Sequence, residues 1–140
     1  MANIIPTAFK TELLSGTHNF ANGGNSFKLA LYTSNPYSAS STAYATTNEV
    51  SSSGTSYTAG GQALDSQAVA ATNTTGHVDF ADETFSSVTL TAAFAAIYND
   101  TNSDKLCLVL DFGGNKTATN GDFVMQFPTA NASDAIIRIA

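Results

Sequence analysis

The segment Lys105–Phe112, which reads KLCLVLDF, decides the fold class. It is a short apolar run in which both alternating sets of side chains are hydrophobic, the pattern of a strand buried on both faces. The single cysteine, Cys107, lies inside the run, so we expect a buried, inert thiol rather than a disulfide or a thiolate metal site. The segment therefore predicts a central strand of a β-sheet.

Strand patterns recur on both sides of this segment, separated by polar turns. Together they predict an all-β protein, a single-domain β-sandwich or jelly roll of about seven or eight strands. Gly113–Thr117 is expected to be a turn between two of them. The other expected strands are Phe27–Thr33, Gln62–Ala71, Gly76–Phe80, Glu83–Phe85, Ser87–Tyr98, Asp122–Phe127 and Ala135–Ile139.

The strand patterns also predict which side chains form the core. It should consist of Phe27, Leu29, Leu31, Phe80, Phe85, Ile97, Leu106, Leu108, Leu110, Phe112, Phe123, Met125, Phe127, Ile137 and Ile139.

Only the N-terminal region has a helical pattern. Thr7 is a candidate N-cap, Phe9 and Leu13 share a face at i,i+4, and Gly16 supplies a stop, so a helix is expected over roughly residues 8–14. With Ile4 and Ile5 it forms an N-terminal strap over residues 1–16, followed by the β-domain over 17–140, within one domain overall. The strap packs either on the chain's own sheet or on a partner.

A long stretch rich in Ser, Thr and Ala, Ser34–Thr58, carries three tyrosines: Tyr37, Tyr44 and Tyr57. A loop of this length is usually functional or packed against something. Two interpretations follow. The tyrosines either offer contact area to a partner, or they fix the loop to the sheet.

Composition limits the possible partners. Charged residues make up only 11% of the chain, against about 25% in average proteins, and the net charge is −6. The 5 Lys and Arg residues cannot build the basic stripe that neutralises phosphates. We therefore expect no nucleic-acid partner and no binding to an anionic membrane. The start of the chain lacks the pattern of a secretory signal, and no window has the length of a membrane span.

No constellation of chemically active side chains stands out. His18 and His77 lie far apart and belong to no metal or catalytic motif. His77 opens an expected strand, and we expect its side chain to be half exposed. The acidic group at residues 79–83 is best explained as a turn. Asp100, Asn102 and Asp104 alternate as in the first half of a calcium loop, without its glycine and late glutamate. Calcium binding stays a minor alternative there, and we expect no catalytic residues, metal or cofactor.

Several segments, taken in order, resemble a group of small virion-associated proteins encoded by tailed bacteriophages. The similarity spans nearly the whole chain, and the Tyr-Thr-Ala-Gly-Gly stretch at residues 57–61 is its most specific piece. Residues 91–94 depart from the group, because they read Thr-Ala-Ala-Phe where Thr-Ala-Arg-Gly is common. The segments that carry the resemblance are 27–33, 48–50, 57–64, 96–99, 109–113 and 135–140.

The resemblance implies a capsid decoration (cement) protein that is made in the host bacterial cytoplasm and located on the phage head surface. Its expected partners are the major capsid protein and further copies of itself. A tail-fibre or tail-tip module that binds host glycans is the alternative, and a cell-wall or capsule hydrolase comes third because no active site supports it. The expected partner-binding residues are Ile4, Ile5, Phe9, Leu13, Tyr37, Tyr44 and Tyr57.

Overall fold

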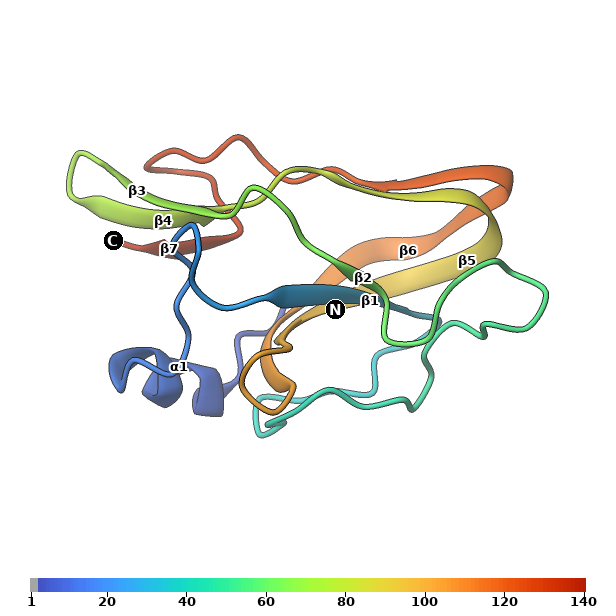
Figure 1. The fold of residues 1–140 in the computed structure, drawn as a ribbon, viewed down its shortest axis with the longest axis horizontal. Coiled ribbons are helices and arrows are strands. Elements are labelled where there is room, and N and C mark those ends of the chain that lie inside the picture. Colours follow the sequence, from blue (N-terminus) through green and yellow to red (C-terminus); the bar gives the residue numbers. More distant parts are fainter. Residues whose placement is uncertain (1–2) are drawn as a thin grey trace.

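A computed structural model describes residues 3–140, so Met1 and Ala2 of the expected strap lie outside the described residues. The chain is an all-β domain with one short helix, which confirms the predicted fold class (Figure 1). The elements are α1 (Thr7–Leu14), β1 (Phe27–Tyr32), β2 (Gln62–Ala63), β3 (Ala68–Thr72), β4 (Thr75–Asp79), β5 (Glu83–Asn99), β6 (Lys105–Met125) and β7 (Ile137–Ile139).

The strands form two antiparallel sheets. One has four strands in the order β2-β1-β5-β6, and the other has three in the order β3-β4-β7. This arrangement is compatible with the expected sandwich.

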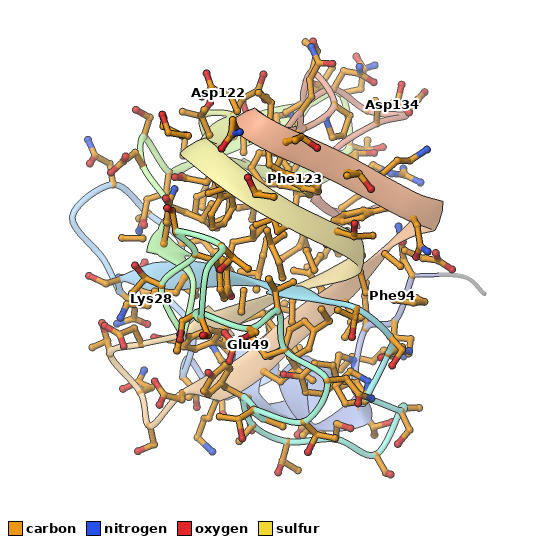
Figure 2. All side chains as sticks on the ribbon, turned by 90° about the vertical axis from the view of Figure 1, so that its right-hand side faces the viewer. Lys28, Glu49, Phe94, Asp122, Phe123 and Asp134 are labelled. Atoms are coloured by element: carbon orange, nitrogen blue, oxygen red, sulfur yellow. The ribbon has the colours of Figure 1, made fainter. Side chains whose placement is uncertain are left out.

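A long β5/β6 ribbon connects the two layers. β5 starts at the upper level of Figure 1, bends at the right and continues at the lower level. β6 runs the opposite way, from the lower level through the same bend to the upper level. At the bend the pairing jumps from Phe94↔Asp111 to Ala92↔Lys116, so β6 carries several extra residues opposite one on β5. Figure 2, viewed from this bent end, shows Phe123 in the interior and Asp122 at the periphery, as strand alternation requires.

The bend corrects the expected turn at Gly113–Thr117. Gly113 and Gly114 have φ values of 77° and 148°, which glycine adopts easily, and they form a bulge within one continuous strand. The expected strand Lys105–Phe112 is therefore part of β6, and so is the expected strand Asp122–Phe127 as far as Met125, where β6 ends.

β6 lies at the edge of its sheet, so the prediction of a central strand is wrong. The reason is that other segments of the chain cover this edge. Ile4 exchanges both backbone hydrogen bonds with Val109 at 2.9 Å, and Leu106 N–H donates to the carbonyl of Thr42 at 3.0 Å. Residues 106–109 of the strand are buried on both faces, as the sequence predicted, because their side chains are divided between two apolar clusters.

Apolar side chains gather on both faces of the four-stranded sheet. The larger cluster lies toward the three-stranded sheet and contains Phe27, Leu29 and Leu31 of β1. The alternate residues Ala30 and Tyr32 belong to a second cluster on the opposite face. The predicted core is buried except that Leu110 and Phe112 are partly buried and Ile139 is 61% exposed.

Three further expectations are corrected. The helix has Pro6 as its N-cap, without a side-chain cap, and Thr7 is its first residue. The N–H of Thr7 donates to the carbonyl of Ala39. The expected strand Gln62–Ala71 is two short strands in different sheets. His77, expected to be half exposed, is 8% exposed and bonded to Thr72.

Candidate functional site

The N-terminal strap packs on its own domain. Ile4 pairs with β6, and Phe9 is 1% exposed, with its ring centroid 4.9 Å from that of His18. Leu13 is partly buried against the main core. Ile5, in contrast, is 41% exposed. Of the strap residues expected to bind a partner, Ile5 has the largest exposed fraction, and Phe9 is almost completely buried.

A buried polar cluster lies beneath α1. His18 Nε2 lies 2.7 Å from Glu12 Oε2, and Asn99 Nδ2 lies 3.0 Å from His18 Nδ1. Cys107 Sγ is 3.8 Å from the same ring nitrogen. These contacts tie the helix to the hairpin between β5 and β6.

The neighbouring Cys107 and His18 do not form an accessible nucleophile and base. Cys107 is 0% exposed, and burial raises the pKa of its thiol far above the usual range. A nucleophilic cysteine needs the thiolate form and access to a substrate. The arrangement is that of a structural contact.

The side chains of Asp100 and Asn102, in the loop that joins β5 to β6, make contacts with other parts of the chain. Asn102 donates its amide to the carbonyl of Thr17, and Asp100 Oδ1 lies 3.7 Å from Lys28 Nζ. Among residues 3–140, no group of three or more His, Cys, Asp or Glu side chains is arranged to hold a metal ion. The loop joins β5 to β6 as a tight connection.

Tyr37 holds the first part of the long loop against β1. Its hydroxyl lies 2.6 Å from the hydroxyl of Tyr32 and accepts from the N–H of Ala45 at 3.0 Å. Tyr32 also donates to the carbonyl of Ala45 at 2.8 Å. Tyr37 is 7% exposed, so its contacts are intramolecular.

Glu49 organises the rest of the loop (Figure 2). Its carboxylate accepts hydrogen bonds from the hydroxyls of Tyr44 and Tyr57 and from the N–H of Gly60, with the last two at 2.7 Å. Tyr57 also accepts from the N–H of Leu31 at 3.0 Å. Burial, and then the Glu49 contact, raise the pKa of Tyr44 and of Tyr57.

The stretch at residues 57–61 has a structural role that explains its distinctive sequence. Gly60 accepts from the hydroxyl of Tyr98, and Gly61, with φ of 80°, passes so close to β1 that an added Cβ would meet the carbonyl oxygen of Leu29 at 1.8 Å. Only glycine fits there.

The three loop tyrosines thus fix the loop to the sheet, which is the second of the two interpretations. Tyr37 and Tyr57 are buried, and Tyr44 stacks on Tyr98 with ring centroids 4.6 Å apart. A partner would reach Tyr37 and Tyr57 only after the loop had moved, whereas Tyr44 is partly exposed.

An apolar surface lies elsewhere, between α1 and the three-stranded sheet. Two adjoining cavities of about 360 and 270 Å³ share Leu13, Ile137 and Ile139 as walls. Among residues 3–140, four of the five exposed large hydrophobic side chains line them. We call this surface the α1–β7 groove; its exposed members are Ile5 (41%), Leu14 (90%), Val69 (57%) and Ile139 (61%).

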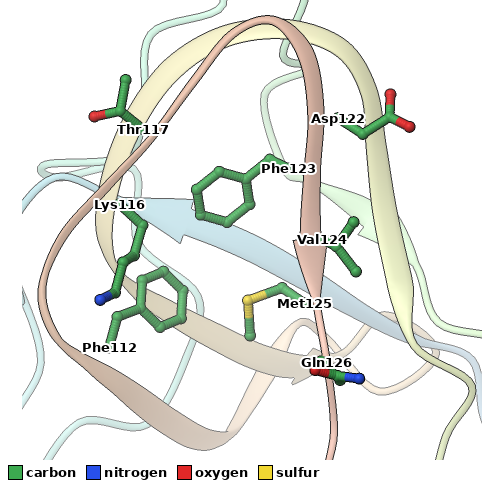
Figure 3. Close-up of a pocket in the computed structure, with 8 residues that line it drawn as sticks. All are labelled: Phe112, Lys116, Thr117, Asp122, Phe123, Val124, Met125 and Gln126. Carbon is green, nitrogen blue, oxygen red and sulfur yellow. The ribbon is translucent and has the colours of Figure 1, made fainter.

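A second hollow, which we call the β6 pocket, lies where the two arms of β6 face each other (Figure 3). Its volume is about 430 Å³. Phe112 comes from one arm and Phe123 and Met125 from the other, and Lys116 lies beside Phe112. Val124 of the second arm also lines this pocket and is 55% exposed.

The sequence did not single out Leu14 or Val69, and it placed Ile139 in the core. Leu14 lies outside the helix face that Phe9 and Leu13 share. Its exposure can be inferred only when the position of the helix is known. Val69 lies in a run of small residues with no clear alternation. Ile139 belongs to a three-residue edge strand, so one side of it has no neighbour.

No family model matches the chain, and searches of curated proteins and of solved structures found no significant match. Among the residues that the structure describes, no helix has the length and apolar character needed to cross a membrane.

Proposed function

We propose that this protein is a non-catalytic structural component of a phage particle, a capsid decoration protein that binds and stabilises the outer surface of the major capsid shell. The resemblance to virion-associated phage proteins supports the origin. The α1–β7 groove is the observation that supports the binding role, because it exposes apolar side chains on a rigid β-domain.

The groove offers enough apolar surface for a repeated contact. Leu14 is 90% exposed, and complete burial of one leucine side chain contributes about 1.5–3 kcal/mol. Each groove contact is modest by itself. On a shell, the same contact recurs at many symmetry-related sites, and linked copies gain from avidity.

The first experiment is to locate the protein in purified particles by mass spectrometry and cryo-EM. Many copies in an ordered layer on the head are expected, with the α1–β7 groove facing the shell. Detection only in tails, or absence from particles, would contradict the proposal.

A pair of variants tests the surface itself. Leu14→Glu should abolish rebinding to particles that lack the protein. Val124→Glu, which changes an exposed apolar residue outside the groove lining, should bind as the wild type does. Equal binding by both variants would exclude the groove as the shell contact.

The β6 pocket favours a second candidate, a tail-fibre or tail-tip module that binds host-surface glycans. Apolar rings beside polar groups, as with Phe112 next to Lys116, suit the apolar and hydroxyl faces of a sugar. Binding to host glycans that is lost in Phe112→Ala, together with a tail location, would favour this candidate over the first.

A further inference from the structure

Strand β3 has the features of an unprotected sheet edge. Its sequence, Ala68-Val69-Ala70-Ala71-Thr72, is mostly apolar, and its first four residues are exposed although they lie in a sheet. β4 pairs with one side of it. Within the part of the chain that the structure describes, no backbone hydrogen bond is made to the other side.

The other sheet edges that the structure describes are shorter, covered or irregular. The first arm of β6 is covered by Ile4 and the 42–44 segment, and its second arm is paired to β5 with register shifts between Phe85 and Leu90. β2 has only two residues, and β7 is three residues long and carries Arg138. Soluble proteins normally protect an edge with charge, proline, a bulge or a covering segment, because a free edge pairs with other strands. β3 has none of these, and its register with β4 runs without a bulge.

The hairpin geometry shows which backbone groups are free. Thr72 and Thr75 flank a two-residue turn and are paired, so they exchange hydrogen bonds across the hairpin. The alternation along β3 then directs the N–H and C=O groups of Val69 and Ala71 away from β4. These groups form the free edge.

We propose that β3 pairs antiparallel with β3 of a second copy of this chain, across a twofold axis at Ala70. Val69 of each copy lies opposite Ala71 of the other, so the free N–H and C=O groups of these residues bond to each other. Ala70 faces Ala70 at the close, non-hydrogen-bonded position, where small side chains fit best. The result is one continuous six-stranded sheet.

Charge and shape both favour a second copy as the occupant. The chain carries a net charge of −6, yet residues 66–78 contain no Asp, Glu, Lys or Arg. Two copies therefore meet here without opposing acidic side chains, which would repel elsewhere on the surface. The sequence is also compatible with itself, because valine meets alanine on one face and alanine meets threonine on the other.

The pairing also places the two apolar grooves together. Val69 is on the same sheet face as Val78 and Ile137, which line the α1–β7 groove. A twofold axis that relates antiparallel strands of one sheet is perpendicular to it, so both grooves face the same side. A dimer then binds a shell through two grooves at once. This last point rests on the proposed function, whereas the pairing does not.

Sedimentation equilibrium of the purified full-length chain, over a range of concentrations, tests the pairing with two matched variants. Val69 and Val124 are strand valines with 57% and 55% exposure. Val69→Lys should weaken the dimer by about tenfold or more, since it loses apolar contact and brings two ammonium groups near each other. Val124→Lys should dimerise as the wild type does, and both variants should keep the monomer's circular dichroism spectrum.

Hydrogen exchange gives an independent readout. The amides of Val69 and Ala71 should become protected as the concentration rises, whereas those of Ala70 and Thr72 are protected at every concentration. A wild-type protein that stays monomeric, a ring of three or more copies, or equal dimerisation by the two lysine variants would overturn the proposal. Because these measurements need no particle, a failure of the decoration role would leave their results unchanged.

Discussion

At the scale of single residues, Glu49 holds together a loop that has little regular structure. Its two carboxylate oxygens accept from Tyr44, Tyr57 and the N–H of Gly60. Hydrogen bonds to a charged group contribute about 1.5–3 kcal/mol each when partly buried, roughly twice those between neutral groups. The loop's order therefore depends on this charge.

Glu49→Gln should lower the free energy of unfolding by about 2 kcal/mol. The amide keeps one acceptor oxygen, but its NH2 group would face the hydroxyl or N–H donors that the second carboxylate oxygen accepts from in the wild type. Urea denaturation would measure the change. Asp79→Asn is the matched control, since Asp79 is also partly buried but makes no such contacts, and it should shift the midpoint little. A Glu49→Gln midpoint equal to that of the control would show that the charge is dispensable.

The buried tyrosines predict sensitivity to alkali. Burial, and then the hydrogen bond with Tyr37, raise the pKa of Tyr32; burial and the Glu49 contact raise that of Tyr57. The folded state thus holds these protons more tightly than the unfolded state does. Their contribution is complete below the ordinary tyrosine pKa of about 10 and is lost as pH rises above it.

The melting temperature should therefore fall steeply above about pH 10. Tyrosinate absorbance should rise together with the loss of near-ultraviolet circular dichroism. If the tyrosines ionised near their ordinary pKa in a protein that stayed folded, the burial of their hydroxyls would be contradicted.

At the scale of elements, the glycine after the long loop sets the approach of β2 to β1. Gly61→Ala combines a left-handed backbone with a Cβ 1.8 Å from the Leu29 carbonyl oxygen. We expect a loss of about 3 kcal/mol or more in unfolding free energy, from the sum of backbone strain and overpacking.

Gly54→Ala separates these two effects. Gly54 also has a positive φ, of 71°, but an added Cβ meets no atom within 4 Å. This variant should lose only the backbone term, about 1–2 kcal/mol. Thermal denaturation measures both losses. Equal losses of stability in the two alanine variants would mean that the backbone of β1 shifts at Leu29 to accommodate the added Cβ.

The sequence predicted those elements whose own residues determine their structure. Phe27–Thr33 was expected as a strand because its large apolar side chains alternate. The observed strand β1 ends one residue earlier, at Tyr32. The bend in β6 could not be read in this way. Two consecutive glycines are typical both of a turn and of a bulge, and only the pairing with Ala92 and Phe94 across the ribbon distinguishes them.

The candidate site was predictable only in part. The strap was recognised from the apolar residues at its start, yet most of its apolar surface is turned inward, and Leu14 was overlooked. Whether an aromatic side chain on a loop faces a partner or its own sheet depends on distant residues. For Tyr57 these are Glu49 and Leu31, and no local pattern reveals them.

At the scale of the whole molecule, the β5/β6 ribbon makes the two layers depend on each other. Each of its strands contributes to both levels of the fold (Figure 1). Damage to one layer should therefore be transmitted to the other, and unfolding should be a single cooperative transition.

Leu108→Asp tests this dependence. Leu108 is 2% exposed, and a buried unpaired charge costs several kcal/mol, which is comparable to the stability of a small domain. We expect loss of structure in the three-stranded sheet as well, detected by hydrogen exchange of β4 amides. Val124→Asp, on the exposed side of the same strand, should remain folded. Protected β4 amides in the Leu108 variant would indicate two independent layers.

The closure of the β6 edge by the start of the chain also has a consequence for biosynthesis. Asn3 bonds to Asp111, 108 residues later, and β4 pairs with the distant strand β7. At a ribosomal rate of about 5–20 residues per second, Asn3 waits on the order of 10 s for its partner. The domain thus completes its folding only after β7 has been synthesised, and we expect newly made chains to need protection from aggregation until then.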